Sequence, residues 1–196
     1  MPSVKIVSIA DVTHNVRRYT LERPAGFTFQ PGQATEVSLD EEGWRDKKHP
    51  FTFTSLTDDP NLEFTIKSYF QTGGDGVTER LYGYVPGRSL VLRDVWGTIT
   101  YKGPGTFIAG GAGVTPFIAI LRDEFEAMHG LKVLWTVTDD PESSLLHERI
   151  DAKFLKAHVG KFDQNFYLCG PDPMVKELRG ILTNLGANVE NVTWEK

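Results

Sequence analysis

Residues 107–116, Phe-Ile-Ala-Gly-Gly-Ala-Gly-Val-Thr-Pro, join an apolar run to a glycine cluster and a helix start. Pro116 suits the first position of a helix because its missing N–H would have no partner there, and the sequence predicts a helix from Pro116 to Met128. Glycines let the backbone approach a ligand closely, and the first-turn N–H groups of a helix point at negative charge. The stretch therefore predicts a strand, turn and helix that bind the phosphates of a nucleotide.

The composition of the 196 residues is that of an ordinary globular protein, with 40% hydrophobic and 24% charged residues. The net charge of −5 disfavours a nucleic-acid binder, and no apolar run reaches membrane-spanning length. The single cysteine, Cys169, excludes an internal disulfide and an iron–sulfur cluster held by this chain alone. The five histidines show no metal-ligand spacing, so no metal site is predicted. Without a signal-peptide core at the N-terminus, a cytoplasmic location is expected.

The first half, residues 1–102, has the pattern of an antiparallel β-barrel. Short segments of alternating polarity are separated by turn signals such as Gln30-Pro31-Gly32 and Val85-Pro86-Gly87. One short helix, Thr78–Tyr82, interrupts them. The predicted strands are Val4–Ile9, Ala34–Leu39, Phe51–Thr54, Leu62–Lys67, Leu90–Leu92 and Thr98–Tyr101.

The second half, residues 103–196, alternates apolar strands with helices, which is typical of a parallel sheet covered by helices. The boundary is placed at Lys102-Gly103-Pro104-Gly105. The predicted strands are Thr106–Ala109, Leu131–Val137, Asn165–Cys169 and Asn188–Trp194. The predicted helices are Pro116–Met128, Leu145–Ala157 and Met174–Leu185.

Two stretches of the first half place chemistry-bearing residues at predicted element ends. His49-Pro50-Phe51-Thr52 puts an aromatic ring beside a hydroxyl, and Gly76-Val77-Thr78 is a glycine turn into a helix with a hydroxyl at the cap. Ile66-Lys67-Ser68-Tyr69 lies between them. Taken singly, these stretches are also typical of an amphipathic strand and of a hairpin loop with an ordinary cap.

Taken in order, the motifs resemble those of the ferredoxin–NADP⁺ reductase superfamily along nearly the whole chain. The Arg-x-Tyr-Ser/Thr strand of that family corresponds to His49–Thr52, and its glycine–hydroxyl helix start corresponds to Gly76–Thr78. Pro86-Gly87 follows, as in the family. The second-half motifs Gly-x-Gly-x-x-Pro and Cys-Gly-Pro correspond to residues 111–116 and 169–171.

The resemblance implies FAD on the barrel, with NAD(P)H as co-substrate. Phe51 would lie against the isoalloxazine ring, and the Thr52 hydroxyl would bond near its reactive nitrogen. Amides around Gly76, Val77 and Thr78 would take the pyrophosphate. The other FAD contacts expected on the barrel are His49, Pro50, Lys67 and Tyr69, with Tyr69 on the ribityl or adenine side.

Two departures from the family pattern fall in the FAD motif. His49 stands in place of an arginine that grips the pyrophosphate, and Phe51 stands in place of a tyrosine. Lys47, Lys48 or Arg80 could supply the missing charge. We expect flavin binding to be retained but weakened, which leaves the FAD occupancy open.

In the second half, the resemblance implies that Gly111, Gly113, Thr115 and Pro116 receive the pyridine nucleotide, with Thr115 near the nicotinamide. Cys169, Gly170 and Pro171 would stand where the nicotinamide reaches the flavin. Thr52, Thr115 and Cys169 are thus the residues expected at the reacting atoms, as positioning groups. Trp194 either shields the flavin, as a terminal aromatic does in parts of the family, or is an ordinary core or surface tryptophan. A free cysteine at a strand end is also a common buried small residue.

The segment after Ile120 allows two interpretations. In the preferred one, about twenty residues of the family pattern, amounting to one βα unit, are missing near Arg122–Asp123, and Leu131–Val137 is the third strand. In the other, Leu131–Val137 is the second strand, and Asp139 and Asp140 at its end favour NADH by repelling a 2′-phosphate. The choice between NADH and NADPH stays open.

The sequence thus predicts a two-domain flavoprotein that transfers hydride from NAD(P)H to FAD and then electrons to a separate acceptor. Ferredoxin, flavodoxin or a small molecule are the candidate acceptors. The alternatives are a component that depends on a partner and a flavin-binding redox sensor that does not turn over NAD(P)H. Oligomeric state and physiological acceptor are not predicted.

Overall fold

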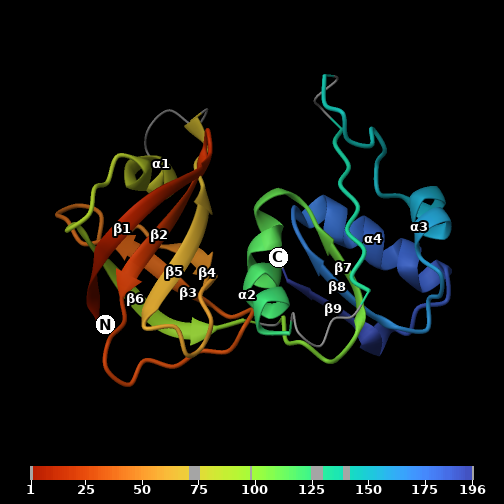
Figure 1. Ribbon diagram of the computed structural model, residues 1–196, viewed down its shortest axis with the longest axis horizontal. Coiled ribbons are helices and arrows are strands. Elements are labelled where there is room, and N and C mark those ends of the chain that lie inside the picture. The colour runs from red at the N-terminus through yellow and green to blue at the C-terminus, as the bar shows by residue number, and fades with distance from the viewer. Residues whose placement is uncertain (1, 71–75, 98, 125–129, 139–141, 196) are drawn as a thin grey trace. The chain divides into compact units, whose positions relative to one another are not determined.

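The computed structural model describes residues 2–70, 76–97, 99–124, 130–138 and 142–195 (Figure 1). The chain divides into two compact units. The first unit comprises Met1–Tyr101 and Val114–Asp123, and the second comprises Lys102–Gly113 and Glu124–Lys196. The predicted boundary between residues 102 and 103 stays a prediction, since the chain returns to the first unit at Val114.

Six antiparallel strands form one barrel-like sheet in the first unit, in the order β4-β3-β6-β1-β2-β5. The two ends of the sheet meet at a single bridge between Phe53 and Phe64, so the barrel does not close with a full ladder. The strands are β1 (Ser3–Thr13), β2 (Val16–Glu22), β3 (Ala34–Leu39), β4 (His49–Thr52), β5 (Asn61–Lys67) and β6 (Ser89–Trp96).

The barrel interior is filled by the inward-facing residues of these alternating strands. Phe53 stacks between Phe29 and Phe64, and the buried Tyr19 hydroxyl donates to the carbonyl oxygen of Leu81 at 3.2 Å. Leu81 belongs to the helix α1 (Val77–Tyr82), which lies against this core. The helix is thereby fixed on the barrel by its apolar face.

One predicted strand in this half is wrong, and one observed strand was missed. Residues 99–101 form no strand, although alternation predicted one from Thr98 (itself outside the described residues) to Tyr101; β6 instead runs to Trp96. The strand β2 was not predicted, because Arg17-Arg18 obscures its alternation. Its inward residues, Tyr19 and Leu21, are fully buried, and it pairs with both β1 and β5.

The helix α2 (Thr115–Asp123) belongs to the first unit, although it directly follows the glycine turn. Pro116, Phe117, Ala119 and Ile120 form its buried face. The predicted helix extends to Met128, and residues 125–129 lie outside the described residues.

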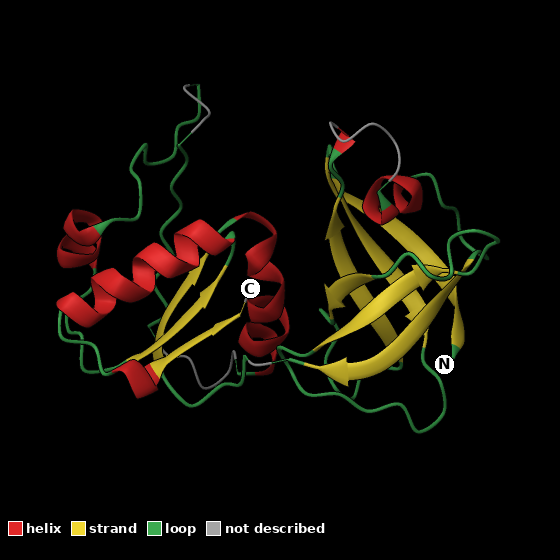
Figure 2. Ribbon diagram, turned by 180° about the vertical axis from the view of Figure 1, so that it is seen from behind, coloured by secondary structure: helices red, strands yellow, loops and turns green. Residues whose placement is uncertain are grey.

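The second unit contains a three-stranded parallel sheet in the order β7-β8-β9 (Figure 2). The helix α4 lies across one face of this sheet, where Val175, Leu178 and Leu182 join the buried core. The elements are β7 (Gly105–Ala109), the 3-10 turn η2 (Gly111–Val114), α3 (Ala152–His158), β8 (Asn165–Cys169), α4 (Asp172–Asn184), the 3-10 turn η4 (Val189–Asn191) and β9 (Val192–Glu195).

The predicted strand Leu131–Val137 is wrong. The stretch carries no strand, Thr136 makes an isolated bridge to Leu146, and Trp135 is 64% exposed. The predicted helix from Leu145 to Ala157 is also shorter. It begins at Ala152, because the Asp151 carboxylate caps it by accepting from the Phe154 N–H at 2.9 Å.

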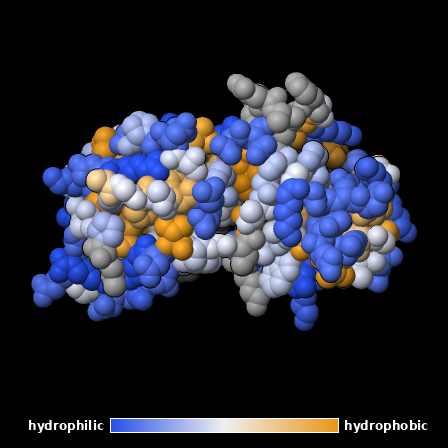
Figure 3. Space-filling view, turned by 90° about the horizontal axis from the view of Figure 1, so that it is seen from below, coloured by the Kyte–Doolittle hydropathy of each residue, from blue (hydrophilic) through white to orange (hydrophobic). Residues whose placement is uncertain are grey.

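The predicted fold class is confirmed: an antiparallel barrel-like sheet is followed by a small parallel α/β sheet. The face of the molecule in Figure 3 is mostly hydrophilic, with apolar side chains exposed in places.

Candidate functional site

The strand β4 carries the aromatic and hydroxyl residues predicted to hold the flavin. It is an edge of the sheet, which tolerates Pro50 because an edge strand needs fewer N–H donors. Phe51 is 8% exposed and packs toward Phe64, while the imidazole of His49 stacks on the Phe51 ring at 4.8 Å. The exposed ring at this edge is therefore that of His49, with Phe51 behind it. The Thr52 side chain is half-buried.

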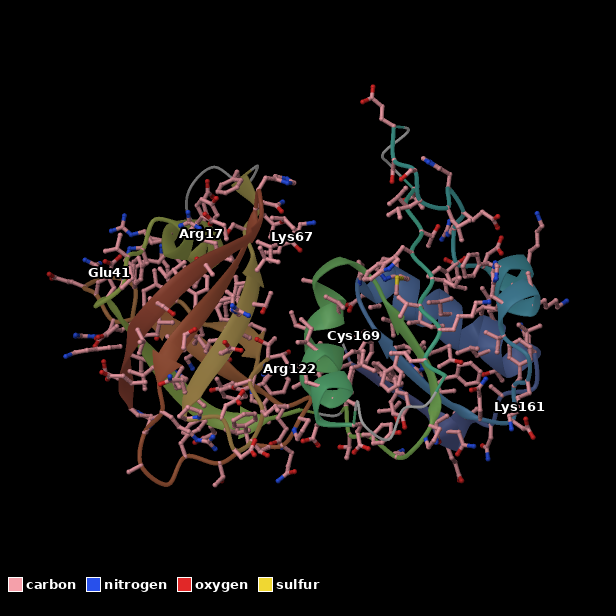
Figure 4. The ribbon with its side chains drawn as sticks, in the orientation of Figure 1. Arg17, Glu41, Lys67, Arg122, Lys161 and Cys169 are labelled. Atoms are coloured by element: carbon pink, nitrogen blue, oxygen red, sulfur yellow. The ribbon has the colours of Figure 1, made fainter. Side chains whose placement is uncertain are left out.

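Lys67 and Tyr69 lie at the end of β5. The Lys67 ammonium is 5.5 Å from the centre of the Tyr69 ring, a cation–π contact, and Tyr69 is half-exposed. Lys67 is labelled in Figure 4. The pair combines a positive charge with an exposed aromatic face, which suits a ligand with both phosphate and ring.

The helix start at Gly76–Thr78 differs from the prediction in one detail. Gly76 is the N-cap, no side chain caps the helix, and Thr78 lies inside the first turn instead of at the cap. Thr78 is buried, and its carbonyl oxygen accepts a 3.0 Å hydrogen bond from the Ser68 hydroxyl. Because a glycine N-cap leaves the helix start without a side-chain cap, its amides suit a phosphate of the ligand.

The cations considered as replacements for the family arginine are all engaged within the first unit. Arg80 donates to Glu41 at 2.8 Å, and Arg88 pairs with the same carboxylate. The hydrogen bond from Arg80 is the main reason that the pKa of Glu41 lies below its usual value. Lys48 lies 3.4 Å from Glu36, and Lys47 lies 4.1 Å from the centre of the Trp44 ring.

In the second unit, the glycine turn packs tightly against the end of β8. The Gly110 N–H donates to the carbonyl oxygen of Cys169 at 2.9 Å, and a Cβ atom on Gly113 would lie 2.3 Å from that oxygen. A side chain at Gly113 is therefore excluded by the protein itself, before any ligand is considered. Gly111, with φ +56°, has open space around it.

Cys169 is buried at the carboxyl end of β8. Burial, followed by the charge of Glu195, raises the pKa of its thiol from 9.0 to about 11, and a hydrogen bond from the Gly170 backbone opposes the shift. The thiol is therefore neutral at physiological pH and acts as a packing group. Pro171 then serves as the N-cap of α4, with its carbonyl oxygen accepting from the Val175 N–H.

Glu195 was not predicted as a site residue. It lies opposite Cys169 in the β8–β9 register, and strand alternation places it on the same face of the sheet. The sequence did hold a signal for Glu195. Val192-Thr193-Trp194-Glu195 has the pattern of a strand, and the end of such a strand would lie next to the end of the strand that finishes at Cys169.

Trp194 lies on the other face of β9, where its ring packs with the core and the Arg179 guanidinium lies 4.0 Å from its centre. This contact gives Trp194 a packing role, and its shielding of a flavin stays a prediction. Thr115 and Pro116 open α2 in the first unit, whereas Gly111 and Gly113 belong to the second. Asp139 and Asp140 lie outside the described residues.

Comparison with known proteins finds similarity to flavin-binding proteins in the first unit. Residues 1–89 match an FAD-binding domain family. The chain is 30% identical over 122 residues to the reductase component of a naphthalene 1,2-dioxygenase system from Pseudomonas putida. This match covers 60% of this chain and 35% of the relative. It is 25% identical over 235 residues to the electron transfer component of toluate 1,2-dioxygenase from the same species, covering 99% of this chain and 65% of the relative.

The fold agrees with a ferredoxin NADP⁺ reductase from Neisseria gonorrhoeae solved with bound FAD and NADP. The TM-score is 0.80 at 18% identity, and the match covers 99% of this chain and 97% of the other. The aligned stretch of 235 residues in the toluate dioxygenase component exceeds the 196 residues here, so the relative has segments that this chain lacks. This chain spans less than two thirds of the length of the two curated relatives above. Among the described residues, none of the helices has the length and apolar character that crossing a bilayer requires.

Proposed function

We propose that this chain, which is ferredoxin–NADP⁺ reductase-like, transfers hydride from NAD(P)H to FAD and passes electrons to a separate acceptor. The premise is the match of residues 1–89 to an FAD-binding family. The match of residues 1–89 carries the proposal, because it covers every barrel residue assigned to the flavin. The fold supports the nucleotide half. Bound FAD would supply the chemistry, by accepting two electrons with a hydride and releasing them singly.

The residues of the first unit fit the parts of FAD. His49 and Phe51 offer stacked rings for the flavin plane, and Thr52 offers a hydroxyl at the same strand end. The helix start at Gly76, which lacks a side-chain cap, offers amides to the pyrophosphate, with Lys67 and Tyr69 on the neighbouring strand end. In this assignment Thr52 orients the ring system, and no side chain needs to move a proton for hydride transfer itself.

The second unit fits a nucleotide through its glycine turn. Gly111 leaves open space beside the backbone, while Gly113 lets the turn sit against β8. In the proposal, the turn takes the phosphates of NAD(P)H, Thr115 and Pro116 continue the site, and Cys169 with Gly170 and Pro171 borders the nicotinamide. Cys169 excludes water there as a neutral, buried thiol.

The proposed acceptor is a ferredoxin-type carrier. Two curated relatives are named as reductase or electron transfer components of dioxygenase systems, which supports an electron-transfer partner of that kind. With one cysteine, this chain alone holds no iron–sulfur cluster, so single electrons would pass directly from the flavin to the partner.

The second candidate is a flavin-binding component that does not turn over NAD(P)H itself. It is favoured by the position of Leu131–Val137 outside the three-stranded sheet, since the nucleotide unit then presents a smaller sheet than the sequence predicts.

An anaerobic absorbance titration separates the two candidates. The protein is loaded with FAD, and NADH and NADPH are added in separate experiments. Loss of the flavin band with either nucleotide supports the reductase and identifies its donor. A flavin spectrum that neither nucleotide changes would reject the reductase and support the partner-dependent or sensor role.

The role of Thr52 is tested by Thr52→Ala. Losing one hydrogen bond to the flavin is worth about 1 kcal/mol, so the reduction rate should fall roughly five- to tenfold while FAD content stays constant. Thr20→Ala, a matched loss of a half-buried hydroxyl on β2, should leave the rate unchanged. If stopped-flow traces of Thr52→Ala and the parent chain coincide, Thr52 does not contact the reacting atoms.

A further inference from the structure

The helix α2 (Thr115–Asp123) carries two residues of the proposed site in its first turn. Its first residues, Thr115 and Pro116, continue the glycine turn, yet the helix packs as part of the first unit. Ile120 shows how close this packing is, because a Cβ atom added to Gly32 of the barrel would lie 3.1 Å from the Ile120 Cδ1 atom. The apolar face alone brings the helix to the barrel but gives it little directional restraint.

Arg122, in the last turn of α2, supplies directional contacts (Figure 4). Its Nη1 atom donates to the carbonyl oxygen of Thr54 at 2.7 Å and lies 3.3 Å from Glu63 Oε2. Its Nη2 atom lies 3.4 Å from Asp59 Oδ2. One planar guanidinium thus joins a backbone carbonyl and two carboxylates, a geometry that the single ammonium of lysine does not reproduce.

The acceptors of Arg122 are themselves held in place. Asp59 Oδ2 accepts from the Leu56 N–H at 2.7 Å, which closes the turn before β5. The Thr54 N–H donates to the Glu63 carbonyl oxygen at 2.8 Å, and the Glu63 N–H donates to the Ser55 hydroxyl at 3.1 Å. Arg122 therefore binds a rigid rim of the barrel instead of a loose surface loop.

This rim continues the strand assigned to the flavin. Thr54 is two residues after Thr52, and Phe53, which stands between them in the sequence, forms a bridge to Phe64 of β5. The two carboxylates are 29% and 19% exposed, and Arg122 is 42% exposed, so the ion pairs are partly screened and the bond to the Thr54 carbonyl adds the fixed direction.

We propose that Arg122 is a positioning residue for hydride transfer. Its guanidinium bonds α2 to Thr54, Asp59 and Glu63 at the rim of the barrel. It thereby fixes how the first turn of α2, with Thr115 and Pro116, is held on the barrel. The inference rests on the proposed function for its effect on hydride transfer, while the anchoring of α2 can be measured without turnover. Arg122 acts through α2 and touches neither ligand in this account.

The test compares Arg122→Met, Arg122→Lys and Glu63→Gln in the FAD-loaded full chain, with Arg45→Met as control. Arg45 is an exposed arginine on the same unit that pairs with Asp40 at 2.7 Å, away from α2 in sequence and in contacts. Hydrogen exchange of residues 115–123 reports the anchor. Stopped-flow reduction by the nucleotide that bleaches the flavin gives a limiting rate and a nucleotide affinity separately.

In Arg122→Met, we expect faster exchange in α2 and a limiting rate about tenfold lower, with nucleotide affinity unchanged within about twofold. Arg122→Lys should restore part of both effects, Glu63→Gln should show a smaller loss, and Arg45→Met should match the parent chain. A lower affinity with an unchanged limiting rate would overturn the positioning role, because it would mean that Arg122 serves nucleotide binding.

The outcomes also separate this inference from the proposed function. If neither nucleotide reduces the parent chain, the proposed function fails and the role of Arg122 in hydride transfer fails with it. Unchanged exchange of α2 in both Arg122→Met and Glu63→Gln overturns the anchor whether or not the chain is a reductase. Faster exchange with a limiting rate equal to that of the parent chain overturns the positioning role.

Discussion

The two sheets of this chain use apolar sequence in different ways. The six strands of the barrel-like sheet are linked by antiparallel pairs, and their alternation turns one side of each strand toward a common core. Within the described residues of the second unit, the parallel sheet joins β7, β8 and β9, and the apolar stretch Leu131–Val137 lies outside it. The same kind of residues thus form a strand in one unit and an exposed segment in the other.

The difference shows that an apolar pattern indicates what a segment can form, whereas pairing depends on which neighbour the chain supplies. Antiparallel strands find a neighbour through a short turn, but a parallel strand needs a crossover of a dozen residues or more. If one βα unit is missing before Leu131–Val137, as preferred from the sequence, the stretch has lost the strand beside which it would lie. The longer alignment with the toluate dioxygenase component is consistent with such a shortening.

The largest expected effect comes from Gly113→Val, which separates the stabilities of the two units. A side chain there would meet the Cys169 carbonyl oxygen at 2.3 Å and the Gly170 nitrogen at 2.5 Å, both of them backbone atoms that cannot turn away. Overpacking of this kind costs about 1–3 kcal/mol or more. Circular dichroism should show the second unit unfolding at lower temperature, while FAD absorbance of the first unit is retained.

Gly180→Ala is the matched control within the second unit. Gly180 lies in α4, and an added Cβ would meet nothing within 4 Å beyond its chain neighbours and the backbone of its own helix, so alanine should stabilise the helix by up to about 1 kcal/mol. Equal melting curves for Gly113→Val and the parent chain would contradict the close packing of the glycine turn on β8.

Much of the barrel could be predicted from sequence because its strands are amphipathic and local. Ala34–Leu39 was predicted with the observed bounds, and β5 within one residue. The strand β2 was missed because the two arginines, Arg17 and Arg18, precede its buried residues Tyr19 and Leu21 and obscure the alternation. In the second unit, β7, β8 and α4 were predicted from apolar runs and glycine punctuation, but whether Leu131–Val137 would find a partner strand is not encoded in that segment.

The candidate site was predicted as a set of motifs, and the contacts between its residues were not. The engagement of Arg80 by Glu41 and the pairing of Cys169 with Glu195 join residues that are far apart in the sequence. Arg122 gave no motif signal, because its acceptors, Thr54, Asp59 and Glu63, lie about sixty residues away in the sequence.

A smaller effect is expected at Cys169 as the pH rises. Its thiol pKa is raised in the fold to about 11, so the folded chain holds this proton more tightly than the unfolded chain. The contribution to stability is fully present below pH 9 and is lost as the pH rises through about 11. Urea unfolding of the parent chain and of Cys169→Ala at several pH values should show their difference shrinking across that range.

Alkylation gives an independent reading of the same thiol. Iodoacetamide at pH 8 should modify native Cys169 slowly and the urea-unfolded chain quickly, because the thiolate is the reactive form. Rapid modification of the native chain would contradict both the burial and the raised pKa.

The smallest expected effect concerns Trp135, which tests the position of the segment outside the sheet. Its side chain is 64% exposed, whereas Trp194 is half-buried beside Arg179, so iodide should quench Trp135 emission preferentially. Trp135→Phe should remove more of the quenchable emission than Trp194→Phe does. If Trp135 resists iodide at low protein concentration, the stretch Leu131–Val137 is covered within the chain, and the contrast between the two sheets disappears. If it resists only at high concentration, a second copy covers the segment, and the second unit completes its sheet or its apolar surface between chains.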